Sequence, residues 1–543
     1  MKKKSVKIFD TTLRDGTQGE GISFSSDDKI RILKRLDRLG VDYVEGGWPG
    51  SNPKDMDFFH KAKNYNCTHT KVVAFGSTMR AGNMAKDDPN LLALLEAETP
   101  AVCIFGKTWL LHVEAALGIT ADENLDLIRQ SVQFLHANGK EVIYDAEHFF
   151  DGYKNNAGYA VQTLLAAEEA GAACLVLCDT NGGTLTHEIS AIIADVKKQV
   201  NIPLGIHAHN DCEVAVANSV AAVQQGCEHV QGTVNGYGER CGNTNLCSLI
   251  PNLQIKLNYQ CIPDEQIKKL TVLSHYVSEL ANLAQPGTMA FVGKSAFAHK
   301  GGIHVSAVMK DPSTYEHIQP DEVGNGRRVL VSDLSGRSNI RYKADELGMD
   351  LSSCGDRLPE VVEVLKNQEN LGYQYEAAEG SLNLLIQRMT KGWKDSFELK
   401  GFRLLIEKNE EELIRSEATV RLKVNGVTEH TAAEGNGPVQ ALDLALRKAL
   451  GKFFPEIDDM HLVDYKVRVL NEKDGTGAKV RVLIDSSSNG HHWGTVGVSE
   501  NIIEASWQAL MESFSYYLLH HQNNKNTNGK HYDETDQDFR HYA

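Results

Sequence analysis

The sequence places side chains that can bind a metal ion directly after short apolar runs. His207 and His209 end one such run, and Arg14 and Asp15 follow another. On a strand, residues i and i+2 point to the same side, so the two imidazoles are expected to converge. Two imidazoles and one carboxylate bind a divalent metal and leave positions open for substrate or water. The pattern therefore predicts a metal site built from Asp15, His207 and His209, and spacing alone leaves Mn, Mg, Zn, Fe and Co open.

Further polar residues follow other apolar runs in the same way. Glu147 ends one run, Thr180 follows the next, and Asn243 lies in a glycine-dense segment after the last. Arg14, next to Asp15, is expected to stabilise a developing oxyanion rather than form a surface ion pair. Glu147 and Thr180 are predicted to line the same site. The alternative for each is a cap on the following segment, since Thr is a good N-cap.

These side chains need a scaffold in which the ends of the runs meet. The first 250 residues alternate amphipathic helical patterns with eight runs rich in Val, Ile and aromatic residues. The runs are 6–10, 43–47, 72–76, 101–106, 142–147, 173–179, 204–210 and 230–235. Nearly continuous apolar runs are typical of strands buried on both faces. An open doubly wound sheet would carry a glycine-rich phosphate-binding turn after its first strand, which is absent here.

Eight strand–helix units predict an α/β fold with a (β/α)8 TIM barrel over residues 1–262. Every polar residue named above then falls at the carboxyl ends of the strands, where barrels of this kind build their active sites. Residues 263–395 read as a helical connector with long loops, and Lys300-Gly-Gly-Ile-His304 within it predicts a titratable group on a mobile loop.

A repeat marks the C-terminal part of the chain. Residues 418–424 resemble residues 478–484, and each copy precedes a second strand-like segment and a helical pattern. The duplication predicts a small α+β domain over residues 396–520. The polar residues 521–543 are expected to be a disordered tail.

Composition excludes several classes of protein. Of 543 residues, 56 are Lys or Arg and 72 are Asp or Glu, which gives a net charge of −16 and argues against nucleic acid as a partner. No apolar run approaches the roughly 18 residues of a membrane span. The ten cysteines are scattered without a CxxC pair. Disulfide frameworks are therefore not expected, and the cytoplasm is the predicted location.

Several motifs, in order along the chain, resemble those of the α-isopropylmalate/homocitrate synthase family. They are Leu13-Arg-Asp-Gly-Thr-Gln18 with Lys29, His207-Ala-His-Asn-Asp211, Gly238-Glu-Arg-Cys-Gly-Asn243, Lys300-Gly-Gly-Ile-His304 and, near the end, Gly435-Asn-Gly-Pro438 with Gly497-Val-Ser-Glu-Asn-Ile-Ile-Glu-Ala-Ser506. The resemblance covers almost the whole chain except its tail.

This resemblance implies a Claisen-type condensation of a keto acid with acetyl-CoA, followed by thioester hydrolysis. It assigns Asp15, His207, His209 and Asn243 to the metal, Arg14 to the alkoxide, and Glu147 and Thr180 to the keto acid or to proton transfer. His304 and Tyr315 of the connector are its candidates for acid–base work. In this family the connector can reach the barrel of a partner subunit, which implies a homodimer.

Two departures bear on the keto acid. Glu213 stands where the family usually has Gly, and His148 stands where Asp is common after the glutamate. Residues 19–24 and 45–54 look most like the branch that uses pyruvate and feeds isoleucine synthesis. That resemblance implies isoleucine as an inhibitory effector of the repeat domain. The alternatives are a synthase for a larger keto acid, a related acyl-CoA lyase or aldolase, and an amino-acid sensor that has lost catalysis.

Overall fold

The computed structural model describes residues 3–332, 335–346, 357–389, 393–408, 414–470 and 477–527, and for 522–527 only the backbone. The chain divides into two compact units. Met1–Phe297 with Ile318–Gly326 form the first, and Ala298–His317 with Arg327–Ala543 form the second. Within the described ranges, no helix has the length and apolar character that crossing a bilayer requires.

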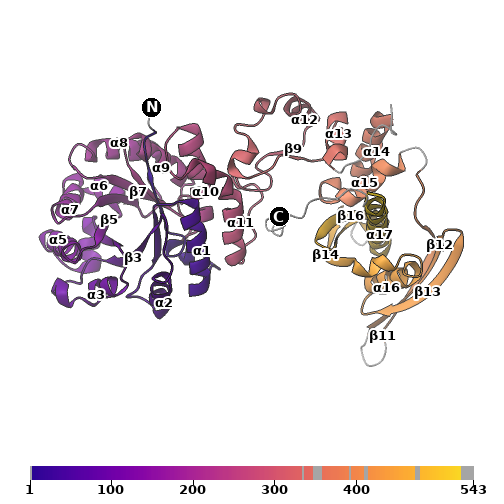
Figure 1. Ribbon diagram of the computed structural model, residues 1–543, viewed down its shortest axis with the longest axis horizontal. Helices are drawn as coiled ribbons and strands as arrows, with labels where there is room; N and C mark the ends of the chain where they lie inside the picture. Colours follow the sequence, from indigo (N-terminus) through magenta and orange to yellow (C-terminus); the bar gives the residue numbers. More distant parts are fainter. Residues whose placement is uncertain are drawn as a thin grey trace. The chain divides into compact units, whose positions relative to one another are not determined.

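The first unit contains a closed barrel of eight parallel strands in sequence order (Figure 1). The strands are β1 (Lys7–Asp10), β2 (Tyr43–Gly47), β3 (Lys71–Ser77), β4 (Ala101–Lys107), β5 (Glu141–Glu147), β6 (Cys174–Asp179), β7 (Leu204–Ala208) and β8 (His229–Gly232). β8 pairs with β1 and closes the barrel. The TIM barrel predicted from the eight apolar runs is confirmed.

Helices surround the barrel on its outer side. They are α1 (Ser26–Leu39), α2 (Pro53–Ala62), α3 (Pro89–Glu96), α4 (Leu110–His112), α5 (Ala121–Ala137), α6 (Phe149–Asn155), α7 (Ala157–Glu169), α8 (Thr186–Val196), α9 (Ala215–Gln224), α10 (Leu246–Pro251) and α11 (Leu270–Leu280). At the start of α1, Ser25 and Asp28 form a reciprocal capping box. Such a cap satisfies amide groups that have no partner within the helix.

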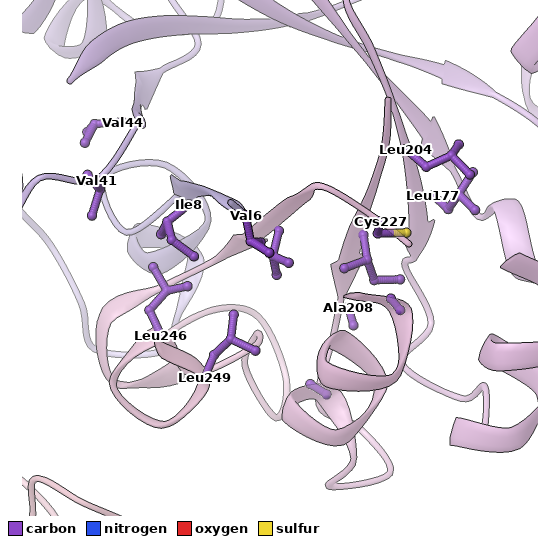
Figure 2. Packing of buried hydrophobic residues seen from close by; sticks show 14 of the residues in the cluster. Val6, Ile8, Val41, Val44, Leu177, Leu204, Ala208, Cys227, Leu246 and Leu249 are labelled. Atoms are coloured by element: carbon purple, nitrogen blue, oxygen red, sulfur yellow. The ribbon is translucent and has the colours of Figure 1, made fainter. Parts of the chain in front are cut away.

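Successive side chains of each barrel strand point alternately outward and inward, so the barrel has two apolar layers. Ile8 and Leu177 face outward and belong to the layer between strands and helices, together with Leu246 and Leu249 of α10 (Figure 2). Phe9, one residue after Ile8, belongs instead to the cluster that fills the barrel interior. Because the side-chain period of a strand is two, each strand supplies both layers, and a polar residue on the inner face is held in a packed environment.

A buried lysine fixes the carboxyl end of β2. Lys29 of α1 donates to the carbonyl oxygen of Gly46 at 2.9 Å and to Asp55 at 2.5 Å. Gly47 has φ +146°, and a Cβ atom there would lie 2.4 Å from the carboxyl carbon of Asp55. Only glycine fits so close to that carboxylate. The ion pair therefore holds the strand end that carries Glu45.

The second unit contains two antiparallel sheets of three strands each. The first consists of β11 (Glu398–Lys408), β12 (Ile414–Val424) and β13 (Val427–Gly435), and α16 (Pro438–Leu450) packs on it. The second consists of β14 (His461–Val469), β15 (Val480–Ser488) and β16 (His491–Ser499), and α17 (Ile502–Thr527) packs on it. The predicted internal repeat of strand, strand and helix is confirmed, with one additional strand before each copy.

The remaining elements of the second unit precede these sheets. They are β9 (Ala298–His299), α12 (Gly302–Val308), β10 (Arg328–Val329), α13 (Arg337–Glu346), α14 (Leu358–Asn370) and α15 (Glu379–Arg388). At the other end, α17 continues to Thr527, past the expected domain boundary at residue 520. The rest of the predicted tail lies outside the described residues.

Candidate functional site

A cavity of about 250 Å³ opens where several barrel strands end. Its lining includes six of the residues predicted for the site: Arg14, Asp15, Glu147, Thr180, His207 and His209. These residues come from four different strand ends that lie far apart in the sequence. The barrel brings them together because parallel strands present their carboxyl ends at one face.

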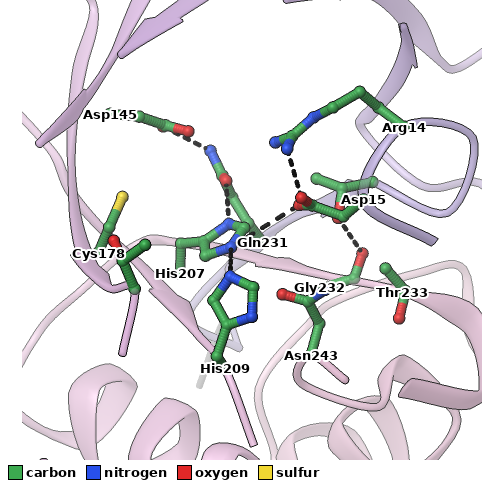
Figure 3. A network of polar contacts seen from close by, with 12 residues as sticks. Arg14, Asp15, Asp145, Cys178, His207, His209, Gln231, Gly232, Thr233 and Asn243 are labelled. Carbon is green, nitrogen blue, oxygen red and sulfur yellow. Dashed lines mark hydrogen bonds and ion pairs between the residues drawn. The ribbon is translucent and has the colours of Figure 1, made fainter. Parts of the chain in front are cut away.

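Asp15, His207 and His209 are buried and lie close together (Figure 3). The Nε2 atom of His207 lies 3.7 Å from Oδ2 of Asp15 and 3.4 Å from Nε2 of His209. Asn243 is next to them, since it forms a backbone bridge with His209. Its side-chain amide donates to the carbonyl oxygen of Tyr237 at 3.2 Å, and that contact orients its Oδ1 atom.

The buried polar atoms of this group test whether it suits a cation. Asp15 Oδ2, Asn243 Oδ1 and His209 Nδ1 have no hydrogen-bond partner. Burial, and then the neighbouring His207, lower the pKa of His209 to about 3, so its imidazole is neutral. Buried polar atoms without hydrogen-bond partners are costly unless something compensates them. Carboxylate, amide and neutral imidazole are suitable ligands for a divalent metal.

The arrangement of these side chains nevertheless differs from that of ligands around a bound metal. Within the described ranges, no group of three or more His, Cys, Asp or Glu side chains has the geometry of a metal site. One oxygen of Asp15 is instead engaged by the Arg14 guanidinium in a short ion pair. The residue types therefore fit a divalent cation, whereas their positions are those of a hydrogen-bonded cluster.

Arg14 is held as a fixed cation beside this cluster. Its Nε atom donates to Oε2 of Glu45 at 2.6 Å, and its guanidinium carbon lies 3.7 Å from the centroid of the Phe75 ring. Burial alone would lower the pKa of Arg14, but Asp15 and Glu45 raise it above its ordinary value. Burial raises the pKa of Glu45, whereas the ion pair with Arg14 opposes this shift and favours the carboxylate. The positive charge of Arg14 therefore persists throughout the physiological pH range.

Glu147 and Thr180 also line the cavity, and each already has a partner. Glu147 forms a short ion pair with Lys107 at the end of β4. The Thr180 hydroxyl accepts a hydrogen bond of 2.9 Å from the backbone N–H of His148, and the Thr180 carbonyl accepts one of 2.7 Å from Arg240. The hydroxyl of Thr180 thus fixes the backbone after β5, and its predicted contact with substrate stays a prediction.

The two predicted connector residues belong to the second unit. His304 lies in α12, and its ring stacks on that of Tyr315 with centroids 4.2 Å apart. The two are therefore neighbours, as a joint role in acid–base chemistry requires. That role remains a prediction.

Sequence reasoning missed Glu45, Asp145 and Gln231 as parts of the site. Asp145 is two residues before Glu147 on β5, and Gln231 interrupts the apolar run of β8. A buried carboxylate or amide within a two-sided apolar strand is the signal that could have identified them. Glu45 precedes two glycines at the end of β2, and its burial against Arg14 becomes visible only in the folded barrel.

Comparison with known proteins places these features in context. Residues 5–277 match the family model described as HMGL-like. Residues 291–371 match a homocitrate synthase post-HMGL domain-like model, and residues 376–518 match the LeuA allosteric (dimerisation) domain. The three matches follow one another along the chain and together span nearly all of its described part.

Full-length relatives agree with this order of domains. The chain is 56% identical to the (R)-citramalate synthase of Geobacter sulfurreducens over 94% of this chain and 97% of the relative. It is 55% identical to the (R)-citramalate synthase of Aquifex aeolicus, over 95% and 98% of the two chains. The corresponding Synechocystis enzyme is 50% identical, over 95% and 97%. The chain therefore belongs to the HMGL-like family of enzymes, in the group of the (R)-citramalate synthases.

Proposed function

We propose that this chain condenses pyruvate with acetyl-CoA and water to give (R)-citramalate and CoA, using a divalent metal ion. The observation that carries the proposal is the group of unpartnered buried polar atoms at Asp15, His209 and Asn243, which lies beside a fixed Arg14 cation. The near-full-length identity to (R)-citramalate synthases favours pyruvate over a larger keto acid and a synthase over a lyase. The reaction is an acyl transfer in which the acetyl group becomes an alkyl group.

In this proposal Asp15, His207, His209 and Asn243 hold the metal, which is Mn, Mg, Zn or Co. When bound, the ion polarises the keto group and makes its carbon electrophilic. A base removes one proton from the acetyl methyl group, and the resulting carbanion attacks the keto carbon. The new carbon–carbon bond replaces the carbonyl π bond, and the alkoxide so formed takes up a proton. Water then cleaves the thioester, which releases CoA as the thiol. The net reaction balances without any oxidant or reductant.

Arg14 would stabilise the alkoxide that develops on the former keto oxygen. Its side chain is already oriented by Glu45 and by Phe75, so little reorganisation is needed when the charge appears. Glu147 and Thr180 would contact the keto acid, and His304 with Tyr315 would exchange protons with the reacting groups. Because Glu147 is paired with Lys107, the pair offers both an acceptor and a cation to an acidic substrate.

Three aromatic rings would limit the size of the keto acid. The centroid of the Trp48 ring lies 5.7 Å from that of Phe75 and 5.8 Å from that of Phe105, and all three residues line the cavity. The two phenylalanine rings are stacked at 5.5 Å. Such a wall would favour the methyl group of pyruvate over a branched or longer side chain.

The regulatory part of the proposal concerns residues 376–518. Their match to the LeuA allosteric (dimerisation) domain supports a homodimer with a regulatory domain. In this proposal isoleucine is the inhibitory effector. We place the enzyme in the cytoplasm, at the first step of a route to isoleucine that does not start from threonine.

The proposal is tested by the initial rate of thiol release with pyruvate, 2-oxobutyrate, 2-oxoisovalerate and 2-oxoglutarate, each with and without isoleucine. We expect the highest kcat/KM with pyruvate, loss of the rate after chelation, and recovery with added Mn²⁺. His207→Ala and His209→Ala should each abolish metal-dependent turnover. Preference for 2-oxoisovalerate or 2-oxoglutarate, or full activity of either variant, would contradict the proposal.

A further inference from the structure

Behind His207 lies a second group of buried polar side chains that contributes no ligand. The Nδ1 atom of His207 is 2.7 Å from Oε1 of Gln231, and Nε2 of Gln231 donates to Oδ1 of Asp145 at 2.8 Å (Figure 3). The three residues come from β7, β8 and β5, so the chain of contacts runs across the barrel interior.

The hydrogen bonds of this network run in one direction, because each group determines whether its neighbour donates or accepts. The amide nitrogen of Gln231 faces Asp145 and donates to its Oδ1 atom, which accepts. The amide oxygen is then left for His207, and an oxygen of this kind can only accept. The Nδ1 atom of His207 must therefore carry a proton, and Nε2 is the ring atom that faces Asp15 and His209.

The three side chains of this network are almost completely buried. Gln231 is 1% exposed, Asp145 3% and His207 5%. Cys103 Sγ lies 4.0 Å from the Gln231 amide nitrogen and fills the space on its other side. Buried networks of this kind are favourable only when every donor meets an acceptor, so the order of donors and acceptors is retained.

We propose that Gln231 and Asp145 are positioning residues that fix the tautomer and ring orientation of His207, so that Nε2 is presented as a metal ligand. The proposal rests on the metal site proposed above and adds two residues that do not themselves contact the metal. Partners behind a ligating histidine commonly change metal affinity by about 10- to 100-fold when they are removed.

The most direct test changes which groups of this network donate and which accept, with little change in the size of the side chains. In Asp145→Asn the new amide can donate or accept, so Gln231 is free to turn over and His207 loses its fixed tautomer. In the double variant Asp145→Asn/Gln231→Glu, the amide introduced on β5 donates to the carboxylate introduced on β8, and that carboxylate can only accept from His207. The original polarity and the number of buried carboxylates are then both restored.

Two measurements on the metal-free full-length enzyme test whether Asp145 and Gln231 fix the tautomer of His207 and strengthen metal binding. Histidine ¹⁵N NMR, with the signal of His207 identified from its absence in His207→Gln, reports the tautomer directly. Isothermal titration with MnCl₂ reports the affinity. We expect the Nδ1–H tautomer in the wild-type enzyme, mixed tautomers and about 10- to 100-fold weaker Mn²⁺ binding in Asp145→Asn, and values within about threefold of wild type in the double variant.

A matched control is available at Gln254, another buried glutamine. It donates to Asp264 at 2.7 Å and accepts from the backbone N–H of Ile262 at 3.2 Å, in the segment after β8. Gln254→Met should leave Mn²⁺ binding unchanged, whereas Gln231→Met should weaken it. If both variants weaken it equally, general loosening of the barrel is responsible, and the proposal is overturned.

The outcomes separate this inference from the proposed function. Weaker Mn²⁺ binding in Asp145→Asn with an unchanged His207 tautomer would mean that Asp145 acts only through its charge, which overturns the proposal. A wild-type enzyme that binds no Mn²⁺ would contradict the ligand set, while the NMR signal of His207 still decides whether Asp145 and Gln231 set its tautomer.

Discussion

The guanidinium carbon of Arg14 lies 3.7 Å from the centroid of the Phe75 ring, while its Nε atom donates to Glu45 at 2.6 Å. A flat cation that lies on a ring and is held at its edge by a carboxylate keeps one orientation. Lysine cannot reproduce this arrangement, because its ammonium group is a compact charge on a flexible stem. The geometry of Arg14, as well as its charge, should therefore matter for the reaction.

We expect Arg14→Lys to lower kcat for thiol release from acetyl-CoA and pyruvate by about 10²- to 10³-fold, with a much smaller change in KM. Loss of one preoriented group that stabilises a developing oxyanion has effects of this size. The measurement is steady-state kinetics at saturating Mn²⁺.

The control is Arg35→Lys. Arg35 of α1 lies over the ring of Tyr276 at 3.9 Å and is not among the residues that line the site cavity. Its replacement should leave kcat within about twofold of wild type, because Arg35 does not line the cavity and has no contact to strengthen in the transition state. An equal loss of kcat in both variants would show that stacking stabilises the barrel and does not serve the reaction.

The aromatic wall predicts a change in specificity. In Phe105→Ala the space beside Trp48 and Phe75 increases, so the ratio of kcat/KM for 2-oxobutyrate to that for pyruvate should rise by about 10-fold or more. One methylene group in an apolar pocket is worth about 1–3 kcal/mol. Phe134→Ala on α5, whose ring packs against the outer core, should leave the ratio unchanged. A ratio that does not move in Phe105→Ala would remove this ring from the substrate pocket.

The buried ion pair of Lys29 and Asp55 predicts a loss of stability. Burial lowers the pKa of Lys29, although Asp55 opposes that shift, so the charge of Lys29 depends on its partner. Lys29→Met leaves the carboxylate of Asp55 buried and unpaired, which should cost about 3–5 kcal/mol and lower the urea midpoint of the first unit. The exposed pair of Lys63 and Glu98, at 2.7 Å, is the comparison. Lys63→Met should cost less than about 1 kcal/mol.

The barrel can be predicted because its sequence pattern, a short apolar run followed by a helical pattern, is local and repeats along the chain. Strands such as β2 and β5 are buried on both faces and read as short apolar runs, and a polar residue at the end of such a run marks the catalytic face. Strand ends alone therefore suffice to place Arg14, His207 and Glu147 at one cavity. The same logic gives no distance between residues on different strands, so it does not predict the engagement of Glu147 by Lys107.

The partners behind the site are harder to predict because they depend on register across the barrel. Gln231 lies beside His207 because β7 pairs with β8 in that register, and it meets Asp145 only across the barrel interior. The end of α17 is hard to predict for another reason. Its last turns are rich in amide residues, which are also common in disordered tails, so sequence composition cannot locate where the helix stops.

At the other end of the barrel, His229 predicts an acid-sensitive fold. It is 2% exposed, and its ring packs against those of Phe9 and Tyr43, with centroids at 5.1 Å and 5.8 Å. Burial, and then the positive charge of Lys7, lower the pKa of His229 to about 3. Its Nε2 atom has no hydrogen-bond partner, so nothing on that side stabilises an added proton.

The sign of the effect follows from proton binding. Between about pH 6.5 and pH 3 the unfolded chain binds a proton at this residue and the folded chain does not, so stability is complete above about pH 6.5 and decreases as the pH falls. At about pH 5 the free energy of unfolding should be about 2 kcal/mol lower than at pH 7 because of this residue.

His229→Gln removes the titrating group, and its urea midpoint should fall less between pH 7 and pH 5 than that of the wild-type enzyme. His60→Gln, an exposed histidine on α2, should keep the wild-type pH dependence; equal pH dependence in all three proteins would mean that other groups cause the acid sensitivity.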